Sequence, residues 1–197
     1  MRTRPGRRGQ LPVALAGGAA AVLLAGATPA AAEPVRYRLD PAHSFVHFEV
    51  MHFATSTLRG RLGPVEGEVS LDPAAGHGAI GLRIDTRSVS TGVPVLDRRL
   101  CQPDLLDCAE PAFFVADRFE FEGGQVRAVV GELTLRGVSR GLRLQALRFG
   151  CRRDGETEVC GGDFEGRLRR SDFGASFGLP FVADAVRLVV QVEGRRR

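Results

Sequence analysis

The stretch Asp40-Pro41-Ala42-His43-Ser44-Phe45-Val46-His47-Phe48-Glu49-Val50-Met51-His52 decides the fold, because a turn signal is followed by side chains that alternate in character. Successive side chains of a β-strand point to opposite faces. One face then carries Ser44, Val46, Phe48, Val50 and His52, and the other carries Phe45, His47, Glu49 and Met51. The first face is apolar in its middle and polar at both ends. This arrangement suits the interior of a barrel that binds an amphiphile.

Similar alternating runs recur along the chain, separated by turn signals rich in glycine, proline and aspartate. They cover residues 65–71, 80–84, 115–121, 126–135, 142–146, 164–168 and 186–192. With the opening stretch they give about eight strands joined by mostly short connections. We therefore predict an all-β fold, an antiparallel eight-stranded β-barrel. A two-sheet sandwich built from the same strands is the alternative.

Two segments depart from this alternation. Residues 92–111 lack the strand pattern, and their apolar residues predict a short helical segment near residues 93–108, interrupted at Pro103. Between Val130 and Leu133 the apolar phase slips by one residue. A bulge near Gly131 is the simplest explanation of that slip.

The first 32 residues have the features of an export signal. Arginines precede an apolar run from Leu11 to Ala27, and Ala30-Ala31-Ala32 offers small residues for cleavage. We predict a signal peptide over residues 1–32 and one domain over residues 33–197, located in the periplasm or secreted. A transmembrane anchor is the alternative, although the run, which contains glycines, is at the short limit for a span. The Arg7-Arg8 pair leaves both Sec and twin-arginine export open.

Removal of the leader changes the charge of the chain. Four of the 27 basic residues and none of the 23 acidic residues precede Glu33, so the remaining chain is formally neutral. The sequence therefore gives no reason to expect nucleic acid or an anionic membrane surface as a partner.

Several ordered motifs resemble those of the YceI-like family. They lie at Asp40 to His52, Ile84 to Gly92, Gly131 to Arg140 and Arg170 to Gly174, within a resemblance that extends from Tyr37 to Gly194. The resemblance implies an exported lipocalin-like barrel that binds polyisoprenoids and related long-chain amphiphiles. It also implies a bound lipid, isoprenoid or fatty-acid-like, and no cofactor.

The four cysteines, Cys101, Cys108, Cys151 and Cys160, are expected to form disulfides, because the chain is predicted to be exported. Four cysteines allow three pairings. We favour Cys151 with Cys160, since the intervening residues read as a polar tip between two strands. Cys101 could then reach Cys108 only if Pro103 breaks the helix, because an unbroken helix would separate them by ~10 Å. No cysteine spacing indicates a metal site.

The sequence shows no catalytic signature. His43 and His52 lie about 30 Å apart along an extended strand, too far to act on one small centre. The chain lacks nucleophile-elbow, phosphate-loop and zinc-protease motifs. We therefore expect no catalytic residue, no metal site and no enzyme activity. A filled structural or interaction barrel is one alternative, and a hydrolase-type enzyme is another.

Our prediction is a binding protein that sequesters a long-chain amphiphile, such as a polyisoprenoid or isoprenoid quinone, in the barrel interior. The sequence leaves open whether the chain forms a homodimer. Glu49, Arg83, Thr134 and Arg167 should face outward. The expected ligand-binding residues are Phe48, Val50, His52, Leu82, Ile84, Leu133, Leu135 and Leu168.

Overall fold

The structure is a computed structural model that describes residues 33–197, so the expected signal peptide over residues 1–32 lies outside the described residues. The described residues form ten strands, one α-helix and two short 3-10 turns, and none of their helices has the length and apolar character needed to cross a membrane. The strands are β1 Val35–Leu39, β2 Phe45–His52, β3 Ser56–Leu62, β4 Val65–Asp72, β5 His77–Ile84, β6 Ala112–Glu122, β7 Gln125–Leu135, β8 Val138–Asp154, β9 Thr157–Arg169 and β10 Val182–Arg196. The helix is α1 Pro94–Leu100, and the 3-10 turns are η1 Thr86–Ser88 and η2 Arg170–Phe173.

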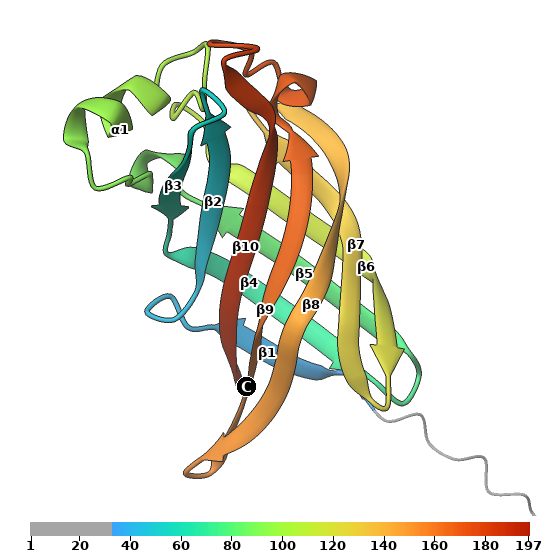
Figure 1. Ribbon diagram of the computed structural model, residues 1–197. Coiled ribbons are helices and arrows are strands. Elements are labelled where there is room, and N and C mark those ends of the chain that lie inside the picture. The colour runs from blue at the N-terminus through green and yellow to red at the C-terminus, as the bar shows by residue number, and fades with distance from the viewer. Residues whose placement is uncertain (1–32) are drawn as a thin grey trace, which may run out of the picture. The chain divides into compact units, whose positions relative to one another are not determined.

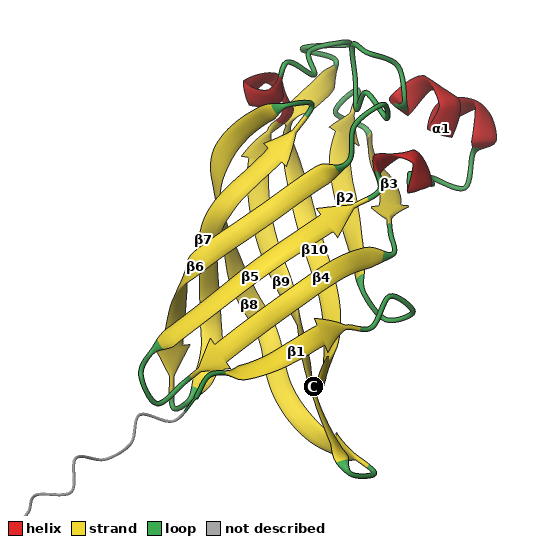
Figure 2. Cartoon of the chain, turned by 180° about the vertical axis from the view of Figure 1, so that it is seen from behind, coloured by secondary structure: helices red, strands yellow, loops and turns green. Residues whose placement is uncertain are grey.

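The strands form one antiparallel sheet that closes on itself. Strands β4 to β10 pair in chain order, and β1 pairs with both β4 and β10. These eight strands make the barrel, while the β2–β3 hairpin continues the sheet beyond β10 (Figure 1). Figure 2 shows the opposite wall, which β1, β4, β5 and β6 cross diagonally. The predicted eight-stranded barrel is confirmed, and the sandwich alternative is wrong because the ring closes.

Strand β10 closes the barrel because one of its edges is shared by two partners, β1 and β2. One edge pairs with β9, while the other pairs with β2 from Val182 to Gln191 and with β1 from Gly194 to Arg196. The turn between β1 and β2 makes this division possible. Asp40 accepts a hydrogen bond from the Ala42 N–H at 2.9 Å and folds the turn out of the wall. After the turn the chain pairs again with the same edge of β10, from Gln191 back to Val182.

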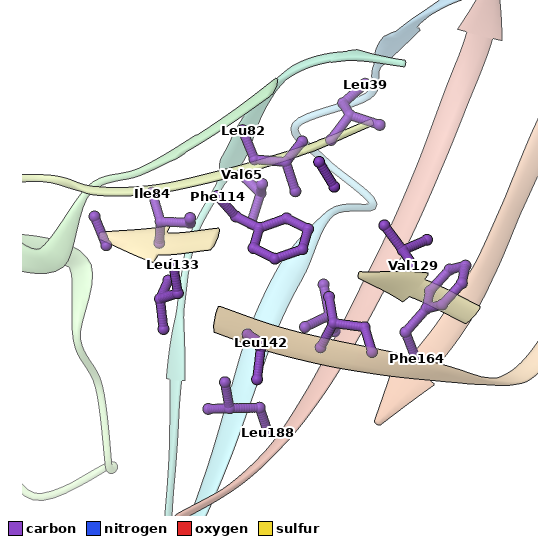
Figure 3. Close-up of a cluster of buried hydrophobic side chains, with 14 of the residues drawn as sticks. Leu39, Val65, Leu82, Ile84, Phe114, Val129, Leu133, Leu142, Phe164 and Leu188 are labelled. Carbon is purple, nitrogen blue, oxygen red and sulfur yellow. The ribbon is translucent and has the colours of Figure 1, made fainter. Parts of the chain in front are cut away.

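The residues that alternate in sequence divide between the interior and the outer surface as expected for most strands. In the interior lie side chains such as Leu82, Ile84, Phe114, Leu133 and Leu188, most of them drawn in Figure 3. Strand β5 can approach β4 because residue 67 is a glycine. Its φ is +154°, and a Cβ there would lie 2.1 Å from the Gly81 carbonyl oxygen of β5. A side chain at position 67 would therefore disturb the β4–β5 pairing.

The phase slip in β7 has a different origin from the one that the sequence suggested. Phe121 pairs with Val126 and Glu120 with Ala128, so Arg127 is the extra residue of a bulge. Val129 is therefore buried, in place of Val130. A second bulge lies in β6. Ala116 pairs with Gly131 and Arg118 with Val130, so Asp117 is the extra residue between them. A bulge near Gly131 is therefore present, as expected, but its extra residue lies in the neighbouring strand β6 rather than in β7.

The outer surface carries ion pairs between adjacent strands. Arg187 of β10 donates to Glu49 of β2 at 3.0 Å and to Glu165 of β9 at 2.6 Å. The hydrogen bonds from Arg59 and Arg187 hold the pKa of Glu49 below its usual range. Because these pairs lie in water, they specify the neighbours of each strand more than they stabilise the fold.

Two disulfides lie in different parts of the chain. Cys151 and Cys160 join β8 to β9, and Cys101 and Cys108 close the turn that follows α1, as the sequence favoured. The helix ends earlier than expected, at Leu100, and Cys101 is its C-terminal cap. The chain then turns at once, which brings the Cα atoms of Cys101 and Cys108 to 4.7 Å. The break is therefore at Cys101 rather than at Pro103.

Tyr37 gives a direct test of barrel closure. Its buried hydroxyl, in β1, donates to Glu158 Oε1 of β9 at 2.5 Å. Burial, and then the hydrogen bond to Glu158, raise the pKa of Tyr37 to about 12. Because the pKa in the unfolded chain is about 10, the stabilisation is complete below that pH and is lost as pH rises through the folded value.

We expect the ultraviolet absorbance of phenolate to report this pKa without ambiguity, because the chain has one tyrosine and no tryptophan. The native protein should titrate near 12 and the urea-unfolded protein near 10. Glu158→Gln should lower the native value, since it removes the negative charge beside the phenol. A native titration near 10 would contradict the placement of Tyr37.

Candidate ligand-binding site

The barrel encloses an apolar cavity of about 170 Å³ near the end where α1 lies. Inward-facing residues of most strands form its walls. Their side chains point inward because each occupies the interior phase of its strand. The lining residues from the strands are Val46, Phe48, Val50, Leu62, Leu82, Ile84, Ala112, Phe114, Leu133, Leu135, Leu142, Leu144, Leu168, Val186, Leu188 and Val190.

Seven of the eight residues expected to contact a ligand lie in this wall. They come from four strands and surround one cavity, which the alternation in sequence could not show by itself. These residues are Phe48, Val50, Leu82, Ile84, Leu133, Leu135 and Leu168. The outward assignment of their neighbours also holds: Glu49 pairs with Arg59, Arg83 with Glu66, and Thr134 hydrogen-bonds with Ser139.

His52 is the exception, and its expected inward position is wrong. It is exposed, and its ring lies edge-on to Phe53 with ring centroids 4.6 Å apart. His52 is the last residue of β2, two positions beyond Val50, which lines the cavity. The end of β2 therefore lies at the rim of the barrel, beyond the cavity. Its imidazole does not line the cavity.

Ser44, the other polar end of the same face, is buried but also lies outside the cavity wall. Its hydroxyl donates to the Glu193 carbonyl at 3.4 Å and accepts from the Glu193 N–H at 3.2 Å. It therefore attaches the β1–β2 turn to β10. The polar ends predicted for this strand serve the fold, and the middle of the strand serves the cavity.

Two connecting segments cover the cavity at the end shown at the top of Figure 1: cap segment 1, residues 85–111, and cap segment 2, residues 170–181. Val89, Leu100, Leu105 and Leu106 of cap segment 1 and Ala175 of cap segment 2 complete the cavity wall. The sequence pattern predicts only a short helix in cap segment 1. No periodic pattern indicated that its leucines face the barrel interior.

Side chains bridge the two cap segments to each other. Arg136, in the turn between β7 and β8, donates to the Phe173 carbonyl at 2.9 Å and also to the Pro103 carbonyl. The Arg99 guanidinium lies 4.0 Å from the centre of the Phe177 ring. These contacts hold the cap segments together over the cavity.

Arg170 is the one ionisable residue in the cavity wall, and it is buried. Its guanidinium donates to the carbonyl oxygens of Ala183, Ala175, Phe177 and Val182 at 2.7 to 2.9 Å. Burial lowers the pKa of this guanidinium. Because its nitrogens already donate to backbone, Arg170 orders cap segment 2 and offers little to a ligand.

The chemistry of the cavity is therefore that of an apolar container. A cavity of ~150 Å³ lined by aliphatic and aromatic side chains stays dry and binds small apolar molecules. The cavity wall presents no carboxylate, imidazole, hydroxyl or thiol. Such a wall can bury hydrocarbon but cannot activate a nucleophile or hold a metal ion.

One group that could hold a metal ion lies outside the barrel, at the β1–β2 turn. Asp40, His43 and Glu193 bring their ligand atoms within 4.8 Å of one another. The carboxylates already have partners, because Asp40 accepts from His43 at 3.0 Å and lies 3.7 Å from Arg195. The hydrogen bond from His43 keeps the pKa of Asp40 below its usual range. These contacts stabilise the β1–β2 turn.

The closed ring, the apolar cavity and its cap define a small-molecule-binding type of antiparallel barrel. The YceI-like domain model matches residues 37–194, and the chain belongs to the YceI-like family. Protein YceI of Salmonella newport is 29% identical over 175 residues, covering 85% of this chain and 90% of the relative.

Two solved structures have a similar fold. BcnA of Burkholderia cenocepacia superposes with a TM-score of 0.63 at 22% identity, covering 79% of this chain and 98% of that one. A polyisoprenoid binding domain from Saccharophagus degradans superposes with a TM-score of 0.57 at 18% identity, covering 82% of this chain and 98% of that one. At these identities the likeness is one of fold.

Arg170→Lys should loosen cap segment 2. Lysine keeps the charge, but its ammonium lacks the planar fork that reaches four carbonyl oxygens. We expect the free energy of unfolding to fall by about 1.5 to 3 kcal/mol, measured by urea unfolding. Amide exchange should rise in residues 174–183 before it rises in the barrel strands.

The matched control is Arg169→Lys at the neighbouring position. Arg169 is exposed and pairs with Asp184, so the loss should stay within about 1 kcal/mol. Equal effects of the two substitutions would show that the buried guanidinium does not order the cap.

Proposed function

We propose that the protein binds a long-chain amphiphile, such as a polyisoprenoid or an isoprenoid quinone. It sequesters or carries this ligand with the ligand's apolar chain inside the barrel. The observation that carries this proposal is the cavity in the barrel, whose wall is apolar apart from Arg170, and the Arg170 guanidinium already donates to backbone carbonyl oxygens. The similar fold of the polyisoprenoid binding domain from Saccharophagus degradans supports the same class of ligand. Family membership supports it further.

The physical driving force is the removal of hydrocarbon from water, about 25 cal/mol for each Å² of apolar surface buried. Because the wall offers no polar partner, a polar head group would lie at the cap rather than inside. Exposed aromatic rings lie beside it: Phe53 of the β2–β3 turn stacks on Phe181 of cap segment 2 with ring centroids 5.7 Å apart. A head group and the first part of a chain would meet this surface.

Binding is favoured over hydrolysis by the composition of the wall. A hydrolase needs a nucleophile or a group that activates water beside the bound substrate. In this cavity the ionisable group is Arg170, which donates to backbone carbonyl oxygens. His52, the one expected site residue with acid–base chemistry, is at the rim and exposed. The alternative of a filled interaction barrel is disfavoured by the cavity itself.

We further propose that the protein acts in the periplasm or outside the cell. The leader-like sequence of residues 1–32 supports export. The disulfides Cys101–Cys108 and Cys151–Cys160 fit an oxidising compartment. A carrier located there would keep an insoluble chain apart from water between membranes or surfaces.

Protein purified from a bacterial host should carry a lipid at one copy per chain or less. Native mass spectrometry before and after organic extraction measures the mass and stoichiometry of that lipid, and the same spectra distinguish a monomer from a homodimer. Protein that is repeatedly recovered empty, and that also fails to take up added isoprenoid, would count against the proposal.

Leu133→Trp should fill the cavity. Leu133 is buried in the wall, so the larger ring would enter empty space and cost less than the ~1 to 3 kcal/mol typical of overpacking a solid core. Affinity for a long-chain isoprenoid should fall about tenfold or more, measured by displacement of a fluorescent fatty-acid probe.

Thr134→Trp is the matched control, since it places the same ring on the outer face of the same strand. It should leave affinity unchanged, as should His52→Ala at the rim. If Leu133→Trp strongly destabilises the protein and binding is absent in the unmodified chain, the barrel is a filled one.

A further inference from the structure

The upper cavity has an apolar neighbour deeper in the barrel. Below the upper cavity of about 170 Å³ lies a second, lower cavity of about 50 Å³. The lower cavity is also apolar and is bounded by side chains such as Tyr37, Phe119, Val129 and Phe164. The two voids share part of their walls. The side chains that border both are Leu82, Phe114, Leu144 and Val190.

These four side chains form a waist across the barrel interior. They come from β5, β6, β8 and β10, so they approach from different sides of the ring. Each is buried, with 3 to 6% of its surface exposed. Phe114 is the largest of the four and the only aromatic one. Figure 3 shows its ring projecting into the interior beside Val65 and Leu82.

Phe114 is held in this position by its neighbours on both sides. In the sheet it is paired with Leu82 of β5 and with Leu133 of β7. Leu82 borders both voids, whereas Leu133 lines the upper one. The ring of Phe114 therefore lies between the upper cavity and the lower one.

We propose that Phe114 limits the length of apolar chain that this barrel admits. The inference rests on the proposed function and deepens it. The upper cavity is close in size to a ~150 Å³ cavity that accepts one benzene ring, so it holds about one or two isoprene units. A longer chain leaves its remaining units at the cap, because Phe114 closes the way to the lower cavity.

The affinity should therefore rise with the length of the ligand's chain at first and then level off. Each methylene placed in the cavity contributes to binding, and methylenes that stay outside contribute little. Geraniol, farnesol and geranylgeraniol form a series of increasing length with one head group. The affinity of the unmodified protein should stop rising within this series. Phe114→Ala joins the two voids, and its affinity should continue to rise.

The experiment measures the affinities of the three alcohols for both proteins by displacement of a fluorescent fatty-acid probe. Geranylgeraniol should bind Phe114→Ala at least about tenfold more tightly than the unmodified protein, and geraniol should differ by less than about threefold. Phe114→Leu, which leaves a smaller void, should give an intermediate profile if the alanine variant does not fold. Phe113→Ala is the matched control, because Phe113 is the adjacent residue and is exposed on the outer face.

Val129→Leu gives a test that leaves Phe114 in place. Val129 borders the lower cavity alone, so added volume there should leave the chain-length profile unchanged if chains stop at Phe114. A weakened affinity for geranylgeraniol in this variant would overturn the inference, as would an unchanged profile in Phe114→Ala. In either case binding by the unmodified protein would still support the proposed function. Absence of binding of all three alcohols to the unmodified protein would overturn both.

Discussion

The cavity depends on the double pairing of β10. One edge of this strand pairs with β9, and the other is divided between β2 at the capped end and β1 at the far end. If only one of these pairings formed, an edge would stay open and water would enter the interior. Ser44, bonded to Glu193, fixes the point at which the two partners meet. Closure, rather than any single hydrophobic contact, therefore keeps the cavity dry.

The cap depends on buried charge in a similar way. A guanidinium removed from water is costly unless its donors are satisfied. Arg170 meets this requirement with the carbonyl oxygens of Ala175 and Phe177, in the irregular part of cap segment 2, and of Val182 and Ala183 at the start of β10. Cap segment 2 is therefore ordered, because disorder in it would leave the buried guanidinium without hydrogen-bond partners. A leucine at this position would line the cavity equally well but could not order the segment.

The sequence predicts the parts of the fold that follow from local periodicity. Alternation placed Val50, Leu133 and Leu168 on the inner wall, because strand geometry alone determines which face a side chain occupies. It misplaced His52, because alternation does not show how far a strand extends beyond the cavity, and His52 is the exposed last residue of β2. It gave no sign of the role of Arg170, whose partners are backbone atoms. Closure, bulges and caps depend on contacts between distant segments, which a single sequence does not display.

An interior that stays partly empty must be stabilised elsewhere. At ~24 cal/mol per Å³, a void of about 170 Å³ costs roughly 4 kcal/mol relative to a filled core. In the chain-entropy model each short disulfide loop contributes about 2 to 3 kcal/mol, and this chain has two of them. One closes a turn in cap segment 1 and the other joins the long β8–β9 hairpin. The disulfides and the void thus nearly offset each other, and a bound chain that fills the void would make the protein more stable than the empty barrel.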